Sequence, residues 1–323
     1  MLNRSAFCLL RVLVALLICS CEAKSPGAPL LVFSEGCSGS TSLVRTIGKF
    51  LRMEGIHTYN KPQKGTNSKG KFDWEVCHKD KNPFYREHEG MATAMKKLAR
   101  DAEHNETTLL IKCEVLGNNH LLDSSRKSDV LKALKGLGTT PILFWRSNVL
   151  DHYICTVRDC FHSSNKEYPV SMNGKETDLC FKRRRSNTTV KAMLDPSRMV
   201  RKLKEMRGYV SYATKILKEN GVEVPPPFTY ETLFGFQSNC SMLGTSAVEW
   251  QRLLKIFGVD ISSSKIEDVL RPAANSRPLT SHFKVIYNAK EVWREFFKKS
   301  NAHLLHYLRS TRDYPEPNKT LRC

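Results

Sequence analysis

The sequence predicts an α/β fold of three layers, with a central parallel β-sheet flanked by helices. Two observations support this prediction. Short apolar runs of strand length alternate along the chain with longer segments whose apolar residues recur at helical spacing, a pattern typical of parallel sheets covered on both faces. The chain has 323 residues, of which 41% are hydrophobic, and this is enough for one large domain with a sizeable core.

The predicted elements follow one another in a regular order. Apolar runs predict strands over 30–33, 56–59, 107–113, 140–145 and 227–230. Helical periodicity predicts a first helix that runs from the first loop to Gly55 and another that begins directly after Arg146. It also predicts helices over 87–103, 125–137, 196–220, 247–257, 265–270 and 289–308. Residues 60–85 are polar and rich in lysine, and we interpret them as a long loop region of the kind that often carries function.

The loop after the first predicted strand is dense in glycine and serine. Residues 30–45 read LLVFSEGCSGSTSLVR, so an apolar strand passes through a small-residue loop straight into a helix. Backbone N–H groups and the positive end of the helix dipole converge at such a turn and favour a bound anion. The predicted anion-binding residues are Gly36, Cys37, Ser38, Gly39, Ser40, Thr41 and Ser42.

Two well-known loops of similar composition do not fit this stretch. A Walker A loop has the pattern G-x-x-x-x-G-K-[ST], whereas Gly36 and Gly39 are only three residues apart and no lysine follows the second glycine. A hydrolase nucleophile elbow has the pattern G-x-S-x-G, and the segment from Gly36 to Gly39 is one residue short of it. An ordinary turn with a serine cap is the plain alternative, and the density of glycine and serine favours a phosphate-binding loop of another kind.

Arg146 is a second candidate for anion binding. It ends the predicted strand over 140–145 and opens a helical segment, so its guanidinium is placed to bind another phosphate. Ligands of parallel sheets bind at the carboxyl ends of the strands. We therefore expect the first loop and Arg146 at the same edge of the sheet.

The N-terminal residues predict entry into the secretory pathway. Residues 1–23 have the character of a signal peptide, or of a short signal anchor, because two arginines precede an uncharged and mostly apolar run. That run is shorter than the roughly 20 residues of a membrane span. Membrane attachment is thus expected only through residues 6–21, if they are retained. Residues 24–323 are expected to form a single domain.

The N-glycosylation sequons and the number of cysteines also favour the secretory pathway, with the Golgi lumen or secretion as the predicted destination. N-glycosylation sequons begin at Asn105, Asn187, Asn239 and Asn318. Beyond the leader an even number of cysteines remains, which suggests disulfide bonds, and a bond between Cys160 and Cys180 is one pairing that would close a short basic loop. No paired C-x-x-C motif occurs in the sequence, and no metal is expected.

The net charge of +19 implies an anionic partner. Secretory routing argues against nucleic acid and favours a sulfated or carboxylated glycan or a multiply charged nucleotide. The densest basic run is 182–185, and a looser group of lysines lies within 61–81. Charge runs of this kind are more often solvated loops than binding sites.

Together, the first loop and Arg146 resemble the sulfotransferases that use 3′-phosphoadenosine 5′-phosphosulfate (PAPS). Their first motif is a strand, a loop close to R-S-G-S-T and a helix, and Cys37 to Thr41 read C-S-G-S-T here. The closest branches are the carbohydrate sulfotransferases and the nodulation and sulfolipid enzymes. Three motifs of the nodulation and sulfolipid enzymes match this chain: the pattern R-x-N-x-L-x-x-Y-x-S, the late signature Y-E-x-L and the closing segment. The matching residues are Arg146, Asn148, Leu150, Tyr153, Tyr230, Glu231, Leu233, Arg277, Asn288 and Glu291.

The resemblance covers roughly residues 29–310 and implies a P-loop-NTPase-like sulfotransferase fold. It implies in-line transfer of a sulfuryl group from PAPS to a hydroxyl or amine of an acidic or neutral glycan, free or protein-linked, without a metal. Ser40 and Thr41 with the loop backbone would hold the 5′-phosphate. Arg146, together with Arg277 and the residue at position 155, would hold the 3′-phosphate.

Two positions depart from the family pattern. Cys37 stands where the family has a lysine or arginine that neutralises the bridging oxygen as the sulfuryl group leaves, and Lys112 on the neighbouring predicted strand could supply that charge. Cys155 stands where a serine is expected and offers only a weak thiol donor. A non-catalytic anion- or glycan-binding protein on the same fold is therefore the alternative, and the absent Walker lysine argues against a P-loop kinase.

The resemblance also implies a catalytic base, glutamate or histidine, in the loops above the sheet. Glu75 and His78 in the lysine-rich loop are the preferred candidates, with His57 and Glu114 near other strand ends as alternatives. The sequence leaves the acceptor open, and tyrosine side chains of proteins stay a possible acceptor class beside carbohydrates.

Overall fold

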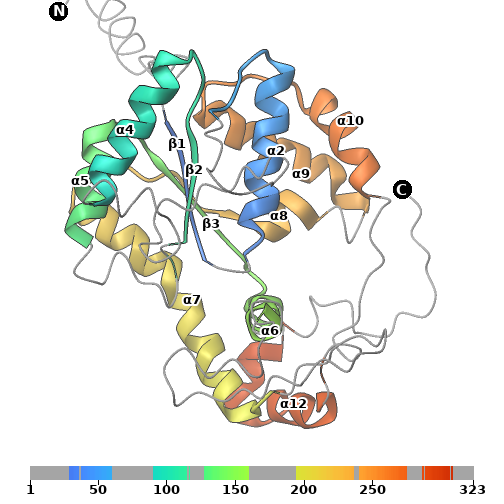
Figure 1. Ribbon diagram of the computed structural model, residues 1–323. Helices are drawn as coiled ribbons and strands as arrows, with labels where there is room; N and C mark the ends of the chain where they lie inside the picture. The colour runs from blue at the N-terminus through green and yellow to red at the C-terminus, as the bar shows by residue number, and fades with distance from the viewer. Residues whose placement is uncertain are drawn as a thin grey trace, which may run out of the picture.

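A computed structural model describes residues 29–35, 38–59, 90–114, 116, 127–159, 194–235, 240–274, 286, 288–305 and 307. Within this part of the chain, four strands form one sheet in the order β2-β1-β3-β4, and all of them run parallel (Figure 1). The strands are β1 (Leu30–Ser34), β2 (Leu110–Glu114), β3 (Pro141–Trp145) and β4 (Phe228–Thr229).

Helices follow the strands as expected for an α/β fold. The α-helices are α2 (Ser40–Met53), α4 (Met91–His104), α5 (Lys127–Leu137), α6 (Val149–Asp159), α7 (Pro196–Glu219), α8 (Tyr230–Phe234), α9 (Leu243–Ile256), α10 (Ser263–Ala274) and α12 (Ala289–Phe296). Two short 3₁₀ helices, η2 (Cys240–Met242) and η3 (Lys299–Leu304), complete the described elements. None of the described helices is both long enough and apolar enough to span a membrane.

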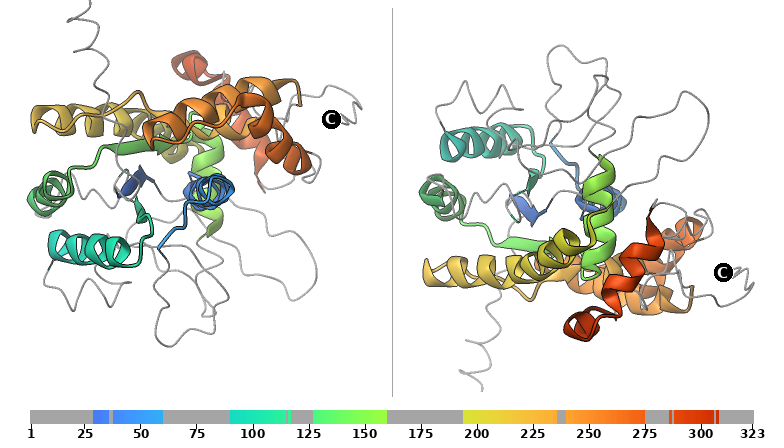
Figure 2. Two further views of the ribbon diagram at one scale, coloured as in Figure 1. Left: turned by 90° about the horizontal axis from the view of Figure 1, so that it is seen from above. Right: turned by 90° about the horizontal axis from the view of Figure 1, so that it is seen from below.

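The helices cover both faces of the sheet, as Figure 2 shows from above and below. Because side chains alternate along a strand, Leu31 and Phe33 of β1 pack against α4, α5 and the C-terminal half of α7. Leu30 and Val32 face the opposite way, into a cluster with α2, α8, α9 and α10. The predicted α/β fold with a parallel sheet flanked by helices is thus confirmed, and this arrangement is compatible with three layers.

A third apolar cluster lies beyond the carboxyl ends of the strands. It joins α6, the N-terminal half of α7, α12 and η3, which gather below the sheet in Figure 1. Trp145, the last residue of β3, packs against both this cluster and the one that holds α4 and α5. The helix that follows Arg146 is therefore supported from below by its own core.

The order of the strands creates a switch point between β1 and β3. The chain leaves β1 to form β2 on one side of it, then crosses back past β1 to form β3 on the other side. Loops that leave two neighbouring strands in opposite directions open a crevice at the carboxyl edge, which is where ligands bind in such sheets. The loop before Ser40 and the turn at Arg146 both start at this point.

Several predicted bounds differ by a few residues, as for the strand over 107–113, which begins at Leu110, and three elements differ more. The strand over 56–59 is reduced to one parallel bridge between Thr58 and Thr108 at the outer side of β2. The strand over 227–230 ends earlier, because Tyr230 already begins α8. The helix over 289–308 is divided after Phe296, since Lys298 has an extended backbone (ψ 138°) and η3 starts only beyond it.

Cys113, in β2, is disulfide-bonded, as the cysteine content led us to expect for this chain. Cys160 and Cys180, the one pair named from the sequence, lie outside the described residues.

Candidate functional site

The turn between β1 and α2 gathers polar groups at the switch point. Gly39 precedes α2 with φ 88°, a left-handed conformation that glycine adopts without steric cost. No side chain among the described residues caps the first turn of α2, and this turn contains no acidic residue. The hydroxyl of Ser38 is fully buried and has no hydrogen-bond partner in the described part of the chain. The helix dipole and these donors favour an anion here.

Lys112 brings a cation to the same turn. Its side chain is 4% exposed and stands in β2 opposite Val32, on the face of the sheet that α2 covers. Its ammonium donates a hydrogen bond to Thr41 Oγ1, 3.4 Å away in the first turn of the helix. A positive charge thus adds to the helix dipole where the sequence analysis placed the 5′-phosphate.

Arg146 follows β3 on the other side of the switch point. Its Nη1 donates to the backbone carbonyl of Asp151 at 3.4 Å, and its Cζ lies 4.5 Å from the ring centroid of Tyr230. Its Nε is buried and has no hydrogen-bond partner among the described residues. The guanidinium is therefore held by stacking while part of its donor capacity stays unused.

Tyr230 connects the start of α2 with Arg146. A Cβ placed on Gly39 would lie 2.5 Å from Tyr230 Cδ2, so the ring occupies the space that any other residue at position 39 would need. The same ring faces Arg146 and stacks on Phe234 with centroids 5.0 Å apart. One side chain after β4 thereby contacts the loop after β1 and the arginine after β3.

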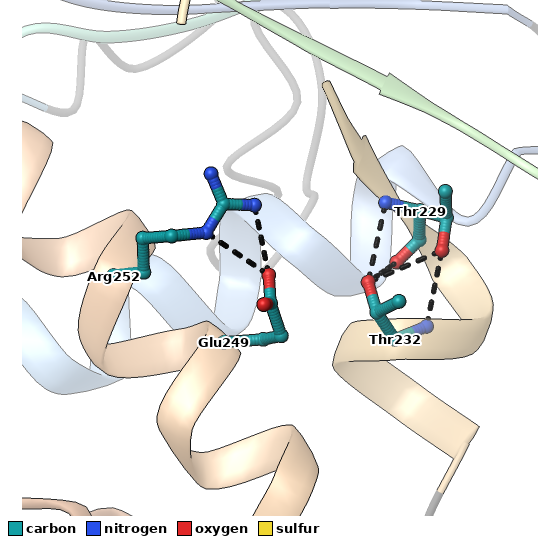
Figure 3. Close-up of polar contacts among 4 residues, drawn as sticks. All are labelled: Thr229, Thr232, Glu249 and Arg252. Atoms are coloured by element: carbon teal, nitrogen blue, oxygen red, sulfur yellow. Dashed lines mark hydrogen bonds and ion pairs between the residues drawn. The ribbon is translucent and has the colours of Figure 1, made fainter. Parts of the chain in front are cut away.

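The turn that carries Tyr230 is itself fixed, as Figure 3 shows. Thr229 Oγ1 accepts from the backbone N–H of Thr232 at 3.1 Å, and the Thr232 hydroxyl accepts from the Thr229 N–H at 3.4 Å, which is a reciprocal helix cap. Beside it, the guanidinium of Arg252 lies 3.8 Å from the ring centroid of Phe228 and pairs with Glu249 at 2.8 Å. Tyr230 therefore starts from a well-supported backbone.

Glu231 caps the second helix at this edge. Its Oε2 accepts from the Ser147 N–H at 2.8 Å and from the Ser147 hydroxyl at 2.7 Å, while its Oε1 accepts from the Asn148 N–H at 3.2 Å. Asn148 Oδ1 in turn accepts from the N–H of Asp151 at 3.2 Å. Because a carboxylate already meets these backbone donors, an anion near β3 would be bound by the side chain of Arg146 rather than by the end of α6.

A contact that the sequence analysis missed joins Glu35 to His152. Glu35 directly follows β1, and its Oε2 lies 3.4 Å from Nδ1 of His152, which is 2% exposed in α6. This pair ties the first loop to the helix behind Arg146. The position of Glu35 at a strand end could have marked it as a candidate, but its partner could not be read from local spacing.

The structure brings together several of the predicted site residues. Ser38, Gly39, Ser40, Thr41 and Ser42 form the start of α2, with Lys112 beside them and Arg146 across the switch point. His57 is exposed and lies next to the outer bridge rather than at this edge.

The side chains of the other predicted site residues lie outside the described part of the structure. Cys155 lies in α6, and its side chain, like that of Glu114, is outside the described part. Gly36, Cys37, Glu75, His78 and Arg277 lie outside the described residues altogether, as do the basic groups 61–81 and 182–185. In the described part of the chain, no group of three His, Cys, Asp or Glu residues could hold a metal ion.

Comparisons with protein-family models, with curated proteins and with solved structures found no match to this chain. The assignment of a function therefore depends on the residues at the switch point and on the motifs that they form.

Proposed function

We propose that this chain is a PAPS-dependent sulfotransferase of the secretory pathway that transfers a sulfuryl group to a hydroxyl or amine of a carbohydrate acceptor. The observation that supports the proposal most strongly is the placement of an uncapped helix N-terminus and a partly unused arginine on opposite sides of one switch point. A nucleotide with phosphates at both ends needs two such positions at a fixed separation.

The chemistry of the side chains fits the phosphates of PAPS. The first turn of α2 offers backbone N–H groups and the hydroxyls of Ser40 and Thr41, which can donate to the 5′-phosphosulfate. Arg146 carries a planar set of donors suited to the 3′-phosphate. Its contact with Tyr230 keeps the guanidinium oriented, which lowers the entropic cost of binding.

Lys112 takes the charge-neutralising role in this proposal. During transfer the acceptor oxygen bonds to sulfur, the bond from sulfur to the bridging oxygen breaks, and the nucleotide leaves with that electron pair. The acceptor proton passes to a base, for which Glu75 and His78 are the candidates. The Lys112 ammonium, beside Thr41, would stabilise the charge on the leaving oxygen in place of the cation that Cys37 replaces.

The proposal is tested by labelled sulfate transfer from PAPS to a panel of glycans, together with calorimetric binding of the product nucleotide, 3′-phosphoadenosine 5′-phosphate (PAP). We expect transfer by the wild-type chain. We expect Arg146→Ala to weaken PAP binding about 10- to 100-fold, because a hydrogen bond to a charged group is worth about 1.5–3 kcal/mol. Arg100→Ala, an exposed arginine of α4, is the matched control and should bind as the wild type does.

The outcomes separate this proposal from its alternative. The substitution of Cys37 for the family's cation favours a non-catalytic anion- or glycan-binding protein on the same fold. Tight PAP binding with no transfer to any glycan or tyrosine-containing peptide would support that second function. If PAP does not bind at all, the proposed sulfotransferase function and the proposed nucleotide site are both wrong.

A further inference from the structure

The exposed face of α7 carries a row of positively charged side chains. The helix has 24 residues and its sequence contains seven basic residues and two acidic ones. With 3.6 residues per turn, the exposed side chains of five of the cations fall within about one third of the helix circumference. This cationic stripe consists of Arg201, Lys204, Arg207, Lys215 and Lys218.

The stripe is poorly neutralised by neighbouring acids. Some cations elsewhere in the described part of the chain do pair with carboxylates, as Lys265 does with Glu54 at 2.8 Å. In the stripe, Lys215 approaches Glu219 at 3.8 Å, whereas Arg201, Lys204 and Lys218 have no ion pair with any described residue. Like charges three or four positions apart repel one another and destabilise a helix, so this face gains from an external anion.

The shape of the stripe limits what that anion can be. From Arg201 to Lys218 it extends about 25 Å along a straight helix, at 1.5 Å per residue. The apolar side of α7 is already used, because it packs on the sheet and on α6 and α12 (Figures 1 and 2). Tyr212 is the one large exposed hydrophobic side chain of the helix, so no apolar face is left to enter a bilayer.

We propose that the cationic stripe of α7 is a second anion site, which binds a linear stretch of sulfated or carboxylated polysaccharide. Regularly spaced negative groups along an extended glycan complement cations that repeat along one helix face. The expected secretory routing makes a glycan, rather than a nucleic acid, the polyanion that this surface meets. The site does not depend on sulfuryl transfer, and it would hold a polyanion whether or not the chain is an enzyme.

The test compares two variants of the full chain that carry the same change in net charge. The first replaces three stripe residues, Arg201→Glu, Lys204→Glu and Lys218→Glu. The second replaces three exposed cations of α4 and α5, Lys97→Glu, Arg100→Glu and Lys132→Glu. Affinity for heparin, used as a sulfated polysaccharide probe, is measured at fixed salt, and PAP binding is measured on the same samples.

We expect the stripe variant to bind heparin at least tenfold more weakly than the wild type and to elute from a heparin column at lower salt. The α4 and α5 variant should stay within about threefold of the wild type, and both variants should keep their PAP affinity. Equal loss in both variants would overturn the proposal, because net charge alone would then explain binding. So would unchanged heparin affinity in the stripe variant, or a larger loss for duplex DNA or anionic vesicles than for heparin. Failure of PAP binding in the wild type would count against the nucleotide site only.

Discussion

At the scale of single residues, Tyr230 explains why position 39 is glycine. Its ring fills the space beside Gly39 and at the same time forms a platform for the guanidinium of Arg146. A residue at the start of α8, directly after the last strand of the sheet order, thus contacts both proposed phosphate positions. The matched signature Tyr-Glu-x-Leu acquires a physical meaning here, since Glu231 caps α6 beside it.

Two substitutions of Tyr230 distinguish the contribution of its ring from the contribution of its hydroxyl. We expect Tyr230→Phe to bind PAP nearly as the wild type does, because the stacked ring remains. Tyr230→Ala should weaken PAP binding about five- to tenfold, since a cation–π contact at a partly exposed site is worth about 1 kcal/mol. Calorimetry measures the affinity, and thermal melting shows whether each variant is folded. Equal affinity in folded Ala and Phe variants would exclude the positioning role.

Lys112 allows a second test, which concerns the rate rather than binding. Lys112→Met keeps most of the side-chain volume but removes the cation beside Thr41. We expect the rate of sulfate transfer to fall about 100-fold, because a group that stabilises developing charge acts mainly in the transition state. PAP affinity should change by less than about fivefold, and thermal melting shows whether the variant is folded. A parallel loss of affinity and rate would assign Lys112 to ground-state binding instead.

The sequence predicted the neighbourhood of the site better than its contacts. Ser38 to Ser42, Lys112 and Arg146 could be placed at one edge because each belongs to, or follows, an apolar run, and parallel strands end on the same side. The contacts of Tyr230 with Gly39 and of Glu35 with His152 join segments that are distant in sequence. No local periodicity reports such pairs, because they arise only when the strand order is known.

At the scale of elements, two helices begin at the same edge with opposite electrostatics. The start of α6 is neutralised by Glu231, whereas no described side chain caps the start of α2 and its first turn contains no acidic residue. An anion would therefore select α2 over α6, although the two helix dipoles are alike. Under the proposed function, this difference favours backbone binding at the first loop and side-chain binding at Arg146.

Asp195 makes a pH-dependent contribution to the long helix α7. Its carboxylate accepts a hydrogen bond from the Ser197 hydroxyl at 2.8 Å, and it also accepts from the N–H groups of Arg198 and Ser197 at 3.2 and 3.0 Å. These bonds, of which that from the Ser197 hydroxyl contributes most, lower the pKa of Asp195 below the usual value of 3.8. The folded state thus favours the charged form. The stabilisation is complete above the unfolded pKa and is lost as the pH falls through the lower folded pKa.

We therefore expect Asp195→Ala to reduce the free energy of unfolding at neutral pH by about 1 kcal/mol, the usual cost of a lost N-cap. The difference between wild type and this variant should shrink below about pH 4. Asp195→Asn keeps a capping side chain that does not titrate, so it should retain most of the stability at pH 7. Urea unfolding at pH 7 and pH 3 measures these differences. A gap between wild type and Asp195→Ala that is as large at pH 3 as at pH 7 would contradict the capping role.

Most helices and strands were predictable because their ends carry local signals. Asp195 and Pro196 mark the start of α7, and Gly221 marks its end. The division between α12 and η3 was not predictable, since apolar residues continue at helical spacing through Phe296 to Leu304 and both lie in the same cluster. The bridge at Thr58 shows that strand length was equally hard to predict. How many residues of a short apolar run pair at the outer side of a sheet depends on the adjacent strand, which the run itself does not reveal.

At the scale of the whole molecule, the site stands between three cores. Two clusters fix the sheet and its covering helices, and the third supports α6 from below through α7 and α12. Arg146 lies where β3 passes from the first of these clusters into the third, next to Trp145, which contacts both. Packing in the third cluster should therefore influence nucleotide binding, whereas packing far from the carboxyl edge should influence stability alone.

Two buried leucines test this expectation. Leu203 of α7 is fully buried in the cluster that supports α6. Leu134 is 2% exposed and lies in the last turn of α5, which leads to the amino end of β3 and is therefore far from the carboxyl edge. We expect each Leu→Ala change to cost about 2–5 kcal/mol of stability, because both leave a cavity. At a temperature where both variants are folded, Leu203→Ala should also weaken PAP binding several-fold through displacement of α6, and Leu134→Ala should not. Urea unfolding and calorimetry on the same samples measure the two effects. Equal affinities in both variants would show that the sheet alone positions Arg146, and the third cluster would then have no part in the site.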